Sequence, residues 1–149
     1  NWQGISVEID EQFQSQWTSR SNECHLADAT TFDWKQAIKK KRWTKKRFDY
    51  VSIDCEPPNI TLKALENLPL HEYRFSVITF ESDLYAHGPE CRDIQRRILN
   101  DLGYQIVARD VQNGGNPFED WWVDPEIVDE ITWGPFISHY AEARSLFVK

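Results

Sequence analysis

The segment at residues 48–59, FDYVSIDCEPPN, constrains the fold of this chain more than any other. Its run at 50–53 carries apolar residues without regular polar alternation, which predicts a strand buried on both faces, as in a parallel sheet. The proline pair at 57–58 removes two backbone donors, so the strand must end before it. Asp54 and Glu56 therefore lie at the end of the strand, and open α/β sheets bind their ligands at that edge.

Strand-like and helical segments alternate along most of the chain. This alternation predicts an α/β fold with a Rossmann-like, mostly parallel sheet and helices on both faces. A turn at 112–116 predicts an antiparallel hairpin at the end of the sheet. We expect a single domain over 1–149, with further strands at 4–10, 24–29, 74–81, 104–111 and 118–123 and helices at 11–20, 32–40, 59–68, 90–102 and 139–147.

Acidic residues follow four successive strands of this pattern: Glu8 and Asp10, Asp28, Asp54 and Glu56, and Glu81. Because the carboxyl ends of parallel strands meet at one edge, we expect a crevice rich in hydrogen-bond acceptors there. Such a crevice suits hydroxyls, amines and cations and repels phosphate groups. Any one acid has an alternative role, since Glu8, Asp10 or Asp28 could cap the helix that follows it. The agreement of four strand ends favours the crevice.

Several other chemistries lack their sequence signals. The chain has no GxxxxGK[ST] or GxGxxG phosphate loop and no GxSxG nucleophile elbow. Asp54 and Glu56 are too close in sequence to flank a sugar as a glycosidase pair. The four histidines are scattered and not spaced like a ligand pair, so no metal site is predicted.

Charge and cysteine content limit the expected partners and location. With 17 basic and 24 acidic residues the net charge is -7, which disfavours general binding to nucleic acid or to an anionic membrane. No apolar stretch approaches the ~18 residues of a transmembrane helix. Three cysteines without a CxxC spacing predict reduced thiols and a cytoplasmic protein.

A basic run, KKKRWTKKR at residues 39–47, holds seven of the 17 basic residues. It lies between a predicted helix end and the entry to the strand at 48–53, at the edge opposite the expected crevice. The run is either a solvated connection or a patch for a polyanion or an acidic partner. The second interpretation leads to an alternative function, that of a non-catalytic interaction module.

The segments VEID, LADA, FDYVSIDCE, VITFE and FEDWWV, in this order and spacing, resemble the class I S-adenosylmethionine-dependent methyltransferases. They are most similar to the FkbM-like branch, because the strand end Ile53-Asp54-Cys55-Glu56 resembles the IDxEG-type motif of that branch. The resemblance covers roughly residues 4–125. It implies transfer of a methyl group to an oxygen or nitrogen of a small molecule or glycan.

The resemblance assigns the cofactor contacts residue by residue. It implies that Glu8 binds the ribose hydroxyls of S-adenosylmethionine, with Asp10 beside it. Asp28 accepts from the adenine amine, next to the backbone of Ala29. Asp54 lies near the methionine end and the transferred methyl group.

The acceptor side follows from the same resemblance. It implies that Glu56 faces the methyl acceptor and that Glu81 lines the acceptor side. A hydroxyl acceptor needs a base to take its proton, and the candidates are Asp54, Glu56 and His87. For His87, a surface loop histidine is the competing interpretation.

The chain departs from the family at two points. It lacks the family's first strand and glycine-rich turn, and Pro57 stands where the branch usually has glycine. That first strand lies between the strands at 4–10 and 48–53, so we expect an incomplete sheet with open edges or two neighbours forced together. We therefore expect weak or absent binding of S-adenosylmethionine and a homo-oligomer formed through the exposed central edge.

Overall fold

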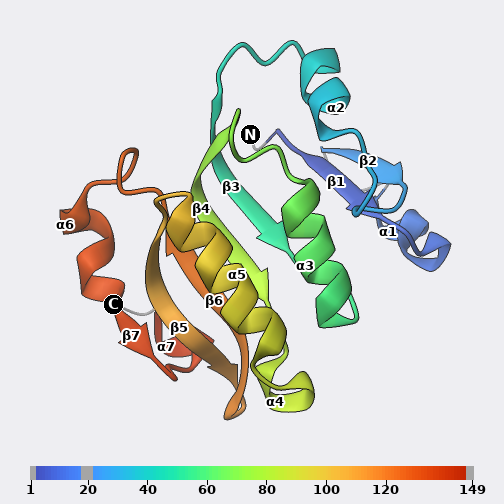
Figure 1. Ribbon diagram of the computed structural model, residues 1–149. Helices are drawn as coiled ribbons and strands as arrows, with labels where there is room; N and C mark the ends of the chain where they lie inside the picture. The colour runs from blue at the N-terminus through green and yellow to red at the C-terminus, as the bar shows by residue number, and fades with distance from the viewer. Residues whose placement is uncertain (1–2, 18–21, 147–149) are drawn as a thin grey trace.

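The computed structural model describes residues 3–17 and 22–146, and it has the predicted α/β architecture (Figure 1). The main sheet has five strands in the order β3-β4-β6-β5-β7. Its pairings are mixed: β3–β4 and β5–β7 are parallel, whereas β6 is antiparallel to both β4 and β5. The strands are β3 (Arg47–Ile53), β4 (Arg74–Glu81), β5 (Gln105–Asn113), β6 (Asn116–Val123) and β7 (Ser138–His139).

A second sheet contains only β1 (Ile5–Glu8) and β2 (Glu23–Leu26), which pair in parallel. The expected single sheet is therefore divided in two, and β1 forms no pairing with β3 in the described residues. Figure 1 shows β1 between β2 and β3, so the division falls at one position. The sequence predicted either open strand edges or a direct pairing of these two strands. The structure has open edges, because β1 and β3 do not pair in the described residues.

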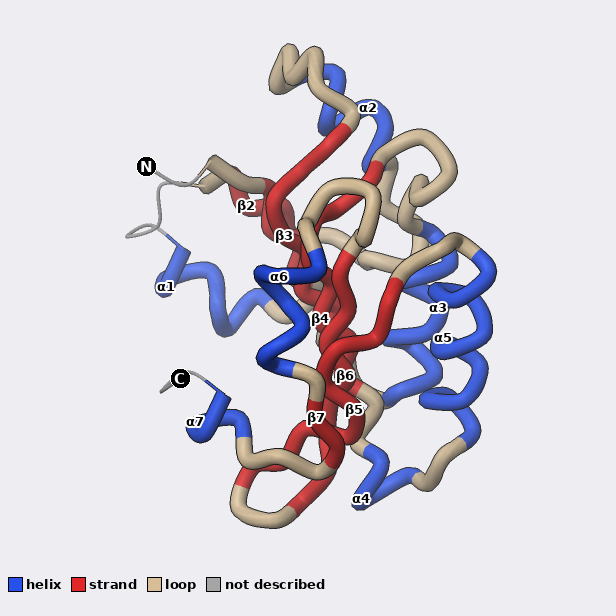
Figure 2. Tube along the Cα trace, turned by 90° about the vertical axis from the view of Figure 1, so that its left-hand side faces the viewer, coloured by secondary structure: helices blue, strands red, loops and turns tan. Residues whose placement is uncertain are grey.

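Helices cover both faces of the main sheet (Figure 2). The two longest, α3 (Pro58–Asn67) and α5 (Glu90–Asp101), pack on one face. Short helices lie on the other: α6 (Glu130–Trp133) and α7 (Ala143–Leu146). A further short helix, α1 (Gln14–Trp17), lies beside the β1–β2 sheet. The remaining helical segments are η1 (Glu11–Phe13), α2 (Trp34–Lys40), α4 (Leu84–His87) and η2 (Gly134–Phe136).

The local pattern predicted most elements and missed some boundaries. The strand at 74–81 is confirmed to the residue. The helix predicted at 11–20 is present at 11–17 as η1 and α1, and its last three positions lie outside the described residues. Of the terminal helix predicted at 139–147, the described residues form a helix at 143–146, because β7 joins the sheet beside β5, and position 147 lies outside the described residues.

The hydrophobic core lies between the main sheet and the α3–α5 layer. Ile78, Phe80 and Trp122 are fully buried from the sheet, and Leu65 and Leu99 meet them from the two helices. β3 departs from the prediction that it is buried on both faces, since Ile53 is its only buried residue. The reason is its position at the edge of the main sheet, where no strand of the described residues is hydrogen-bonded to its outer side.

The predicted hairpin is confirmed, but its place in the sheet differs. Gly114 and Gly115 turn the chain with φ of 61° and 83°, values that favour glycine. β6 then inserts between β4 and β5 instead of lying at the end of the sheet. The edge beyond β5 is taken by β7.

Side chains and packing, rather than sheet hydrogen bonds, attach the β1–β2 sheet. The Asn67 side chain on α3 donates to the carbonyls of Ala29 and Phe32, each at 2.9 Å. Lys35 on α2 forms an ion pair with Glu72. Because both carbonyls belong to the segment after β2, α3 fixes the end of that strand against the main sheet.

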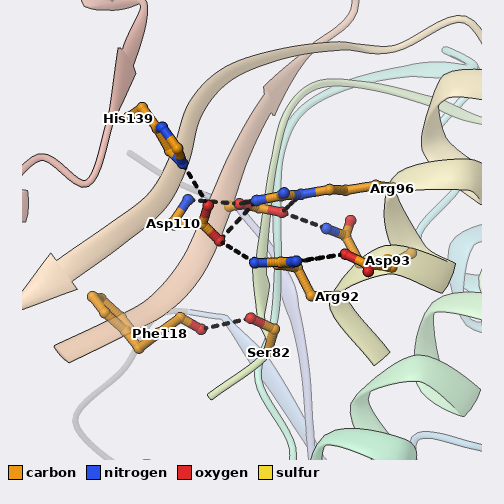
Figure 3. A network of polar contacts seen from close by, with 9 residues as sticks. Ser82, Arg92, Asp93, Arg96, Asp110, Phe118 and His139 are labelled. Carbon is orange, nitrogen blue, oxygen red and sulfur yellow. Dashed lines mark hydrogen bonds and ion pairs between the residues drawn. The ribbon is translucent and has the colours of Figure 1, made fainter. Parts of the chain in front are cut away.

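A buried charged network ties α5 to β5, β6 and β7. Asp120 accepts from Arg96 at 2.7 and 2.8 Å and from the backbone N–H of Asp110 at 2.9 Å. Figure 3 shows Arg92, Arg96 and His139 gathered around the Asp110 carboxylate. Burial alone would raise the pKa of Asp110, but the charge of Arg96 and the hydrogen bonds from His139 and Arg96 hold it below its ordinary value. The Asp110 carboxylate therefore stays ionised and paired.

Replacing Arg96 by Met tests this network. Two buried carboxylates lose a shared partner, so we expect the free energy of unfolding to fall by about 3–5 kcal/mol. The neighbouring Arg97 is exposed, and Arg97→Met should change the stability by less than about 0.5 kcal/mol. Urea denaturation of both variants measures the difference; equal, small losses would show that the network contributes little.

Candidate functional site

Carboxylates from four strand ends gather around Cys55, directly after β3. Burial and the negative charges of Asp54, Glu8, Asp28 and Glu81 together raise the pKa of its thiol. The backbone of Cys55 is fixed from α3, since its N–H donates to Oγ1 of Thr61 at 3.2 Å and the same hydroxyl donates back to its carbonyl. One acid from each of the four predicted strand ends thus lies at one edge of the two sheets.

Asp54 and Glu81 interact directly within this group. Glu81 is partly buried, shares a hydrogen bond with Asp54 and lies near Asp83. Burial, followed by the hydrogen bond and the charge of Asp54, raises the pKa of Glu81 to about 9. Glu81 is therefore protonated at neutral pH, and its proton is shared with Asp54 through this hydrogen bond, as expected for a carboxyl held close to another acid.

Two further acids at this edge were not found from the sequence. Glu119 on β6 is directly opposite Glu81 on β4. Burial raises the pKa of Glu119 although its carboxylate accepts from Nε1 of Trp121 at 2.6 Å. Asp83 is buried, with a left-handed φ of 45°. The hairpin signal pairs β6 only with β5, so nothing in the local pattern places Glu119 beside β4.

Glu8 and Asp28 each keep one carboxylate oxygen that accepts no hydrogen bond from the described residues. Glu8 uses Oε1 to accept from the N–H of Asp10 at 2.9 Å. Asp28 uses Oδ1 to accept from the N–H and hydroxyl of Thr30 at 2.8 and 2.7 Å, and the Thr30 hydroxyl does most to lower its pKa. Oε2 of Glu8 and Oδ2 of Asp28 are available to a ligand.

Helix capping, the alternative role of these acids, is observed for Asp10 and not for Asp28. Asp10 accepts from the N–H of Gln12 at 2.9 Å at the start of η1, so for this residue the capping role is confirmed. Asp28 does not cap α2, because Asp33 does so by accepting from the N–H of Gln36 at 2.9 Å. Asp28 closes its own turn instead. The backbone of Ala29, next to it, is held by α3 as described above.

Glu56 and His87 are exposed. Glu56 lies between β3 and the first turn of α3, and His87 is the last residue of α4. In the described part of the chain no hydrogen bond or ion pair joins either residue to Asp54, so the roles that the resemblance assigns to them stay predictions.

A large cavity of about 1210 Å³ separates β1 from β3. Ile5, Val7 and Val51 contribute apolar side chains to its lining. Glu8 and Asp54 lie at the end nearest Cys55. Arg42, Lys45 and Arg47 line the opposite end, where β3 begins. The cavity is therefore polarised, with an acidic mouth and a basic mouth.

The basic run at 39–47 lies at the predicted edge, opposite the acids. Six of its seven basic residues are exposed, and Lys41 forms an ion pair with Glu23 at 2.7 Å. Within residues 3–17 and 22–146 no group of three or more His, Cys, Asp or Glu side chains is placed to hold a metal ion. No helix in these ranges has both the length and the apolar character needed to cross a membrane.

Comparison with protein families, curated proteins and solved structures adds no relative. No family model matches the chain, and no curated protein or solved structure matches it significantly.

The pKa of Glu81 generates a testable pH dependence. The pKa of Glu81 is about 9 in the folded state and has its ordinary value of 4.5 in the unfolded state, so the folded state holds the proton more tightly. The stabilisation that this proton gives the folded state is therefore complete below pH 4.5 and is lost as the pH rises toward about 9. Glu81→Gln keeps a neutral donor at this position, so its free energy of unfolding should fall less between pH 5 and pH 9 than that of the wild type.

Urea denaturation at several pH values measures this slope. Glu66→Gln, at an exposed position on α3, is the matched control and should keep the wild-type slope. Parallel slopes for the wild type and Glu81→Gln would mean that Glu81 is ionised throughout this range.

Proposed function

We propose that the protein is an S-adenosylmethionine-dependent methyltransferase domain that acts on an oxygen or nitrogen of a small molecule or glycan. The observation that carries the proposal is the gathering of Glu8, Asp28, Asp54 and Glu81 around Cys55. An acidic edge of this kind favours a ligand with hydroxyls, an amine and a positive charge, and disfavours a phosphate ligand. S-adenosylmethionine has a ribose diol, an adenine amine and a sulfonium, and it has no phosphate.

The hydrogen-bond acceptors of the site support this choice of ligand. In the proposal, Glu8 accepts from the ribose diol through its available oxygen, with Asp10 beside it. Asp28 accepts from the adenine amine through Oδ2, next to the backbone of Ala29. Asp54 lies at the methionine end, where a carboxylate stabilises a nearby positive charge.

The proton shared by Asp54 and Glu81 supports a division of catalytic roles. When bound, the cofactor supplies a methyl group activated by the positive sulfur. Glu81 remains protonated beside Asp54, which leaves Asp54 as the member of the pair able to accept the proton that the methyl acceptor loses. Glu56 and Glu81 are proposed to line the acceptor side, and Glu56 and His87 are the other candidate bases. Much of the rate enhancement would come from orienting the acceptor toward the methyl group.

The division between the sheets also supports the proposal. The cavity between β1 and β3 lies where the resemblance locates the family's first strand. The weak cofactor binding expected from the sequence is consistent with an open sheet at this position. The proposed location is the cytoplasm, and Cys24, Cys55 and Cys91 are free thiols.

Cofactor binding by the 149-residue chain tests the proposal. We expect weak binding, detected by chemical-shift changes at residues 8, 28 and 54, and weaker binding still of S-adenosylhomocysteine, which lacks the positive charge. Glu8→Gln and Asp28→Asn should each weaken the binding of S-adenosylmethionine by about tenfold, because each replaces a carboxyl acceptor by an amide. Glu66→Gln is the control of equal charge change.

Two results would argue against this site. Equal affinity for the two nucleosides, together with unchanged affinity in Glu8→Gln and Asp28→Asn, would contradict the proposed cofactor contacts. Micromolar binding by the wild-type chain would leave the site in place and overturn the expectation of weak binding.

The second candidate is a non-catalytic interaction module that uses the run at 39–47. The exposure of six of its seven basic residues favours it. Heparin serves as the test polyanion. Binding that is lost in the double variant Lys39→Glu/Lys40→Glu and unchanged in Asp28→Asn would support this module, and absence of heparin binding at low salt would argue against it.

A further inference from the structure

The edges of β1 and β3 that face each other across the cavity carry backbone groups without a sheet partner. Backbone groups of successive residues in a strand point alternately to its two sides. The carbonyl of Gly4 accepts from the N–H of Glu23 on β2, and the carbonyl of Glu8 accepts from the N–H of Ala27 directly after β2. The N–H and C=O groups of Ile5 and Val7 therefore point away from β2, toward the cavity that both residues line.

The same alternation orients β3. The carbonyl of Lys46 accepts from the N–H of Arg74 at 2.8 Å, so this residue and every second one after it face β4. The backbone groups of Arg47, Asp49 and Val51 point to the opposite side, into the cavity. Buried backbone groups in folded proteins are almost always paired, so two such edges facing one cavity are a site for a strand.

The two edges run in the same direction. Glu8 is the last residue of β1 and Asp54 follows β3, and both charges act on Cys55, so both strands end at the acidic mouth. A single strand placed between them could bond to one neighbour on each side, as in the interior of any sheet, where strands lie about 4.8 Å apart. Strand addition to an open edge obtains affinity from the backbone and specificity from side chains.

We propose that this cavity binds an extended segment of another polypeptide as an added strand. The segment is apolar in its middle, acidic at the end that meets Arg42, Lys45 and Arg47, and basic at the end that meets Glu8 and Asp54. The two mouths require this polarity because like charges placed against them repel. The inference concerns a partner and does not depend on the cofactor proposed above.

Exposed apolar residues lie on the elements that border the cavity, and also on α4, on α6 and beside β7. Ile9, Phe13, Leu26 and Tyr50 are 69%, 40%, 42% and 47% exposed, and they lie on or beside β1, β2 and β3. An added strand would extend the main sheet into β1–β2 and supply β3 with a neighbour on its outer side. Edge strands with open apolar surface are where such pairing occurs.

A second copy of the chain fits this cavity poorly. Every strand in the described residues already has a partner, and β3 of a second copy would bring β4 with it. The cavity is bounded by β1 on its other side, so it admits a strand with two free edges and excludes the edge of a whole sheet. The homo-oligomer expected from the sequence becomes the competing outcome of the test.

The test uses the 149-residue chain and a capped seven-residue peptide that matches the length of β3, Glu-Val-Thr-Ile-Thr-Val-Lys. We expect saturable binding, with the amides of Val7, Asp49 and Val51 gaining protection from hydrogen exchange. The amides of Ser6 and Tyr50, which already face β2 and β4, serve as internal references and should not change. A peptide with proline in place of the central Ile lacks one donor and should bind at least about tenfold more weakly.

Charge reversal provides the matched protein variants. Lys45→Glu/Arg47→Glu reverses the basic mouth and should weaken binding by about tenfold. A peptide with lysine at both ends should bind this variant better than it binds the wild type. Lys39→Glu/Lys40→Glu makes the same change in net charge outside the cavity lining, and it should leave binding unchanged.

Three results would overturn the inference. They are absence of saturable binding, equal binding of the proline peptide, and protection at amides other than those facing the cavity. Sedimentation provides a further arm: a dimer in which Val7, Asp49 and Val51 are already protected without peptide would show that a second copy fills the space.

Discussion

Backbone hydrogen bonding at the outer edge of β3 is the constraint on which the rest of this structure depends. β3 is satisfied by β4 on one side and faces a cavity on the other. The β1–β2 sheet therefore cannot be held through strand pairing. Instead, Asn67 and the Lys35–Glu72 ion pair attach it through the segment after β2 and through α2 and α3. The open edge also explains why a segment with the composition of a buried strand is largely exposed.

The crowding of carboxylates at the strand ends has a second consequence. Negative charges at short range cannot all be retained away from water, so the environments of the acids separate their protonation states. Asp28 is exposed and hydrogen-bonded by Thr30, which lowers its pKa, whereas burial beside Asp54 raises that of Glu81. One edge thus offers ionised acceptors at one end and a shared proton at the other, a combination suited to binding a cation and moving a proton.

The opposite half of the main sheet is built in another way. Asp110 and Asp120 are also buried, but the charges of Arg92 and Arg96 balance them, and His139 is hydrogen-bonded to Asp110. These contacts join α5, β5, β6 and β7 into a unit that has no open strand edge toward the cavity. The half that carries the ion network supplies the rigid support, and the half with the open edges carries the surface available to ligands and partners.

The sequence by itself determined the features that depend on neighbouring residues. Strand propensity locates β3 and β4, and the proline pair at 57–58 marks the end of β3. Glycines mark the hairpin turn. The positions of acids at strand ends identify one group, Glu8, Asp28, Asp54 and Glu81. These features follow from local backbone preferences, which act over a few residues.

Only the tertiary structure decided the pairings between distant segments. The sheet is divided between β1 and β3, β6 lies between β4 and β5, and Glu119 consequently stands opposite Glu81. It also decided that Glu81 keeps its proton at neutral pH, because the tertiary structure partly buries this carboxyl beside Asp54. Strand order and burial depend on contacts across the whole chain, and no local pattern specifies which edge remains open.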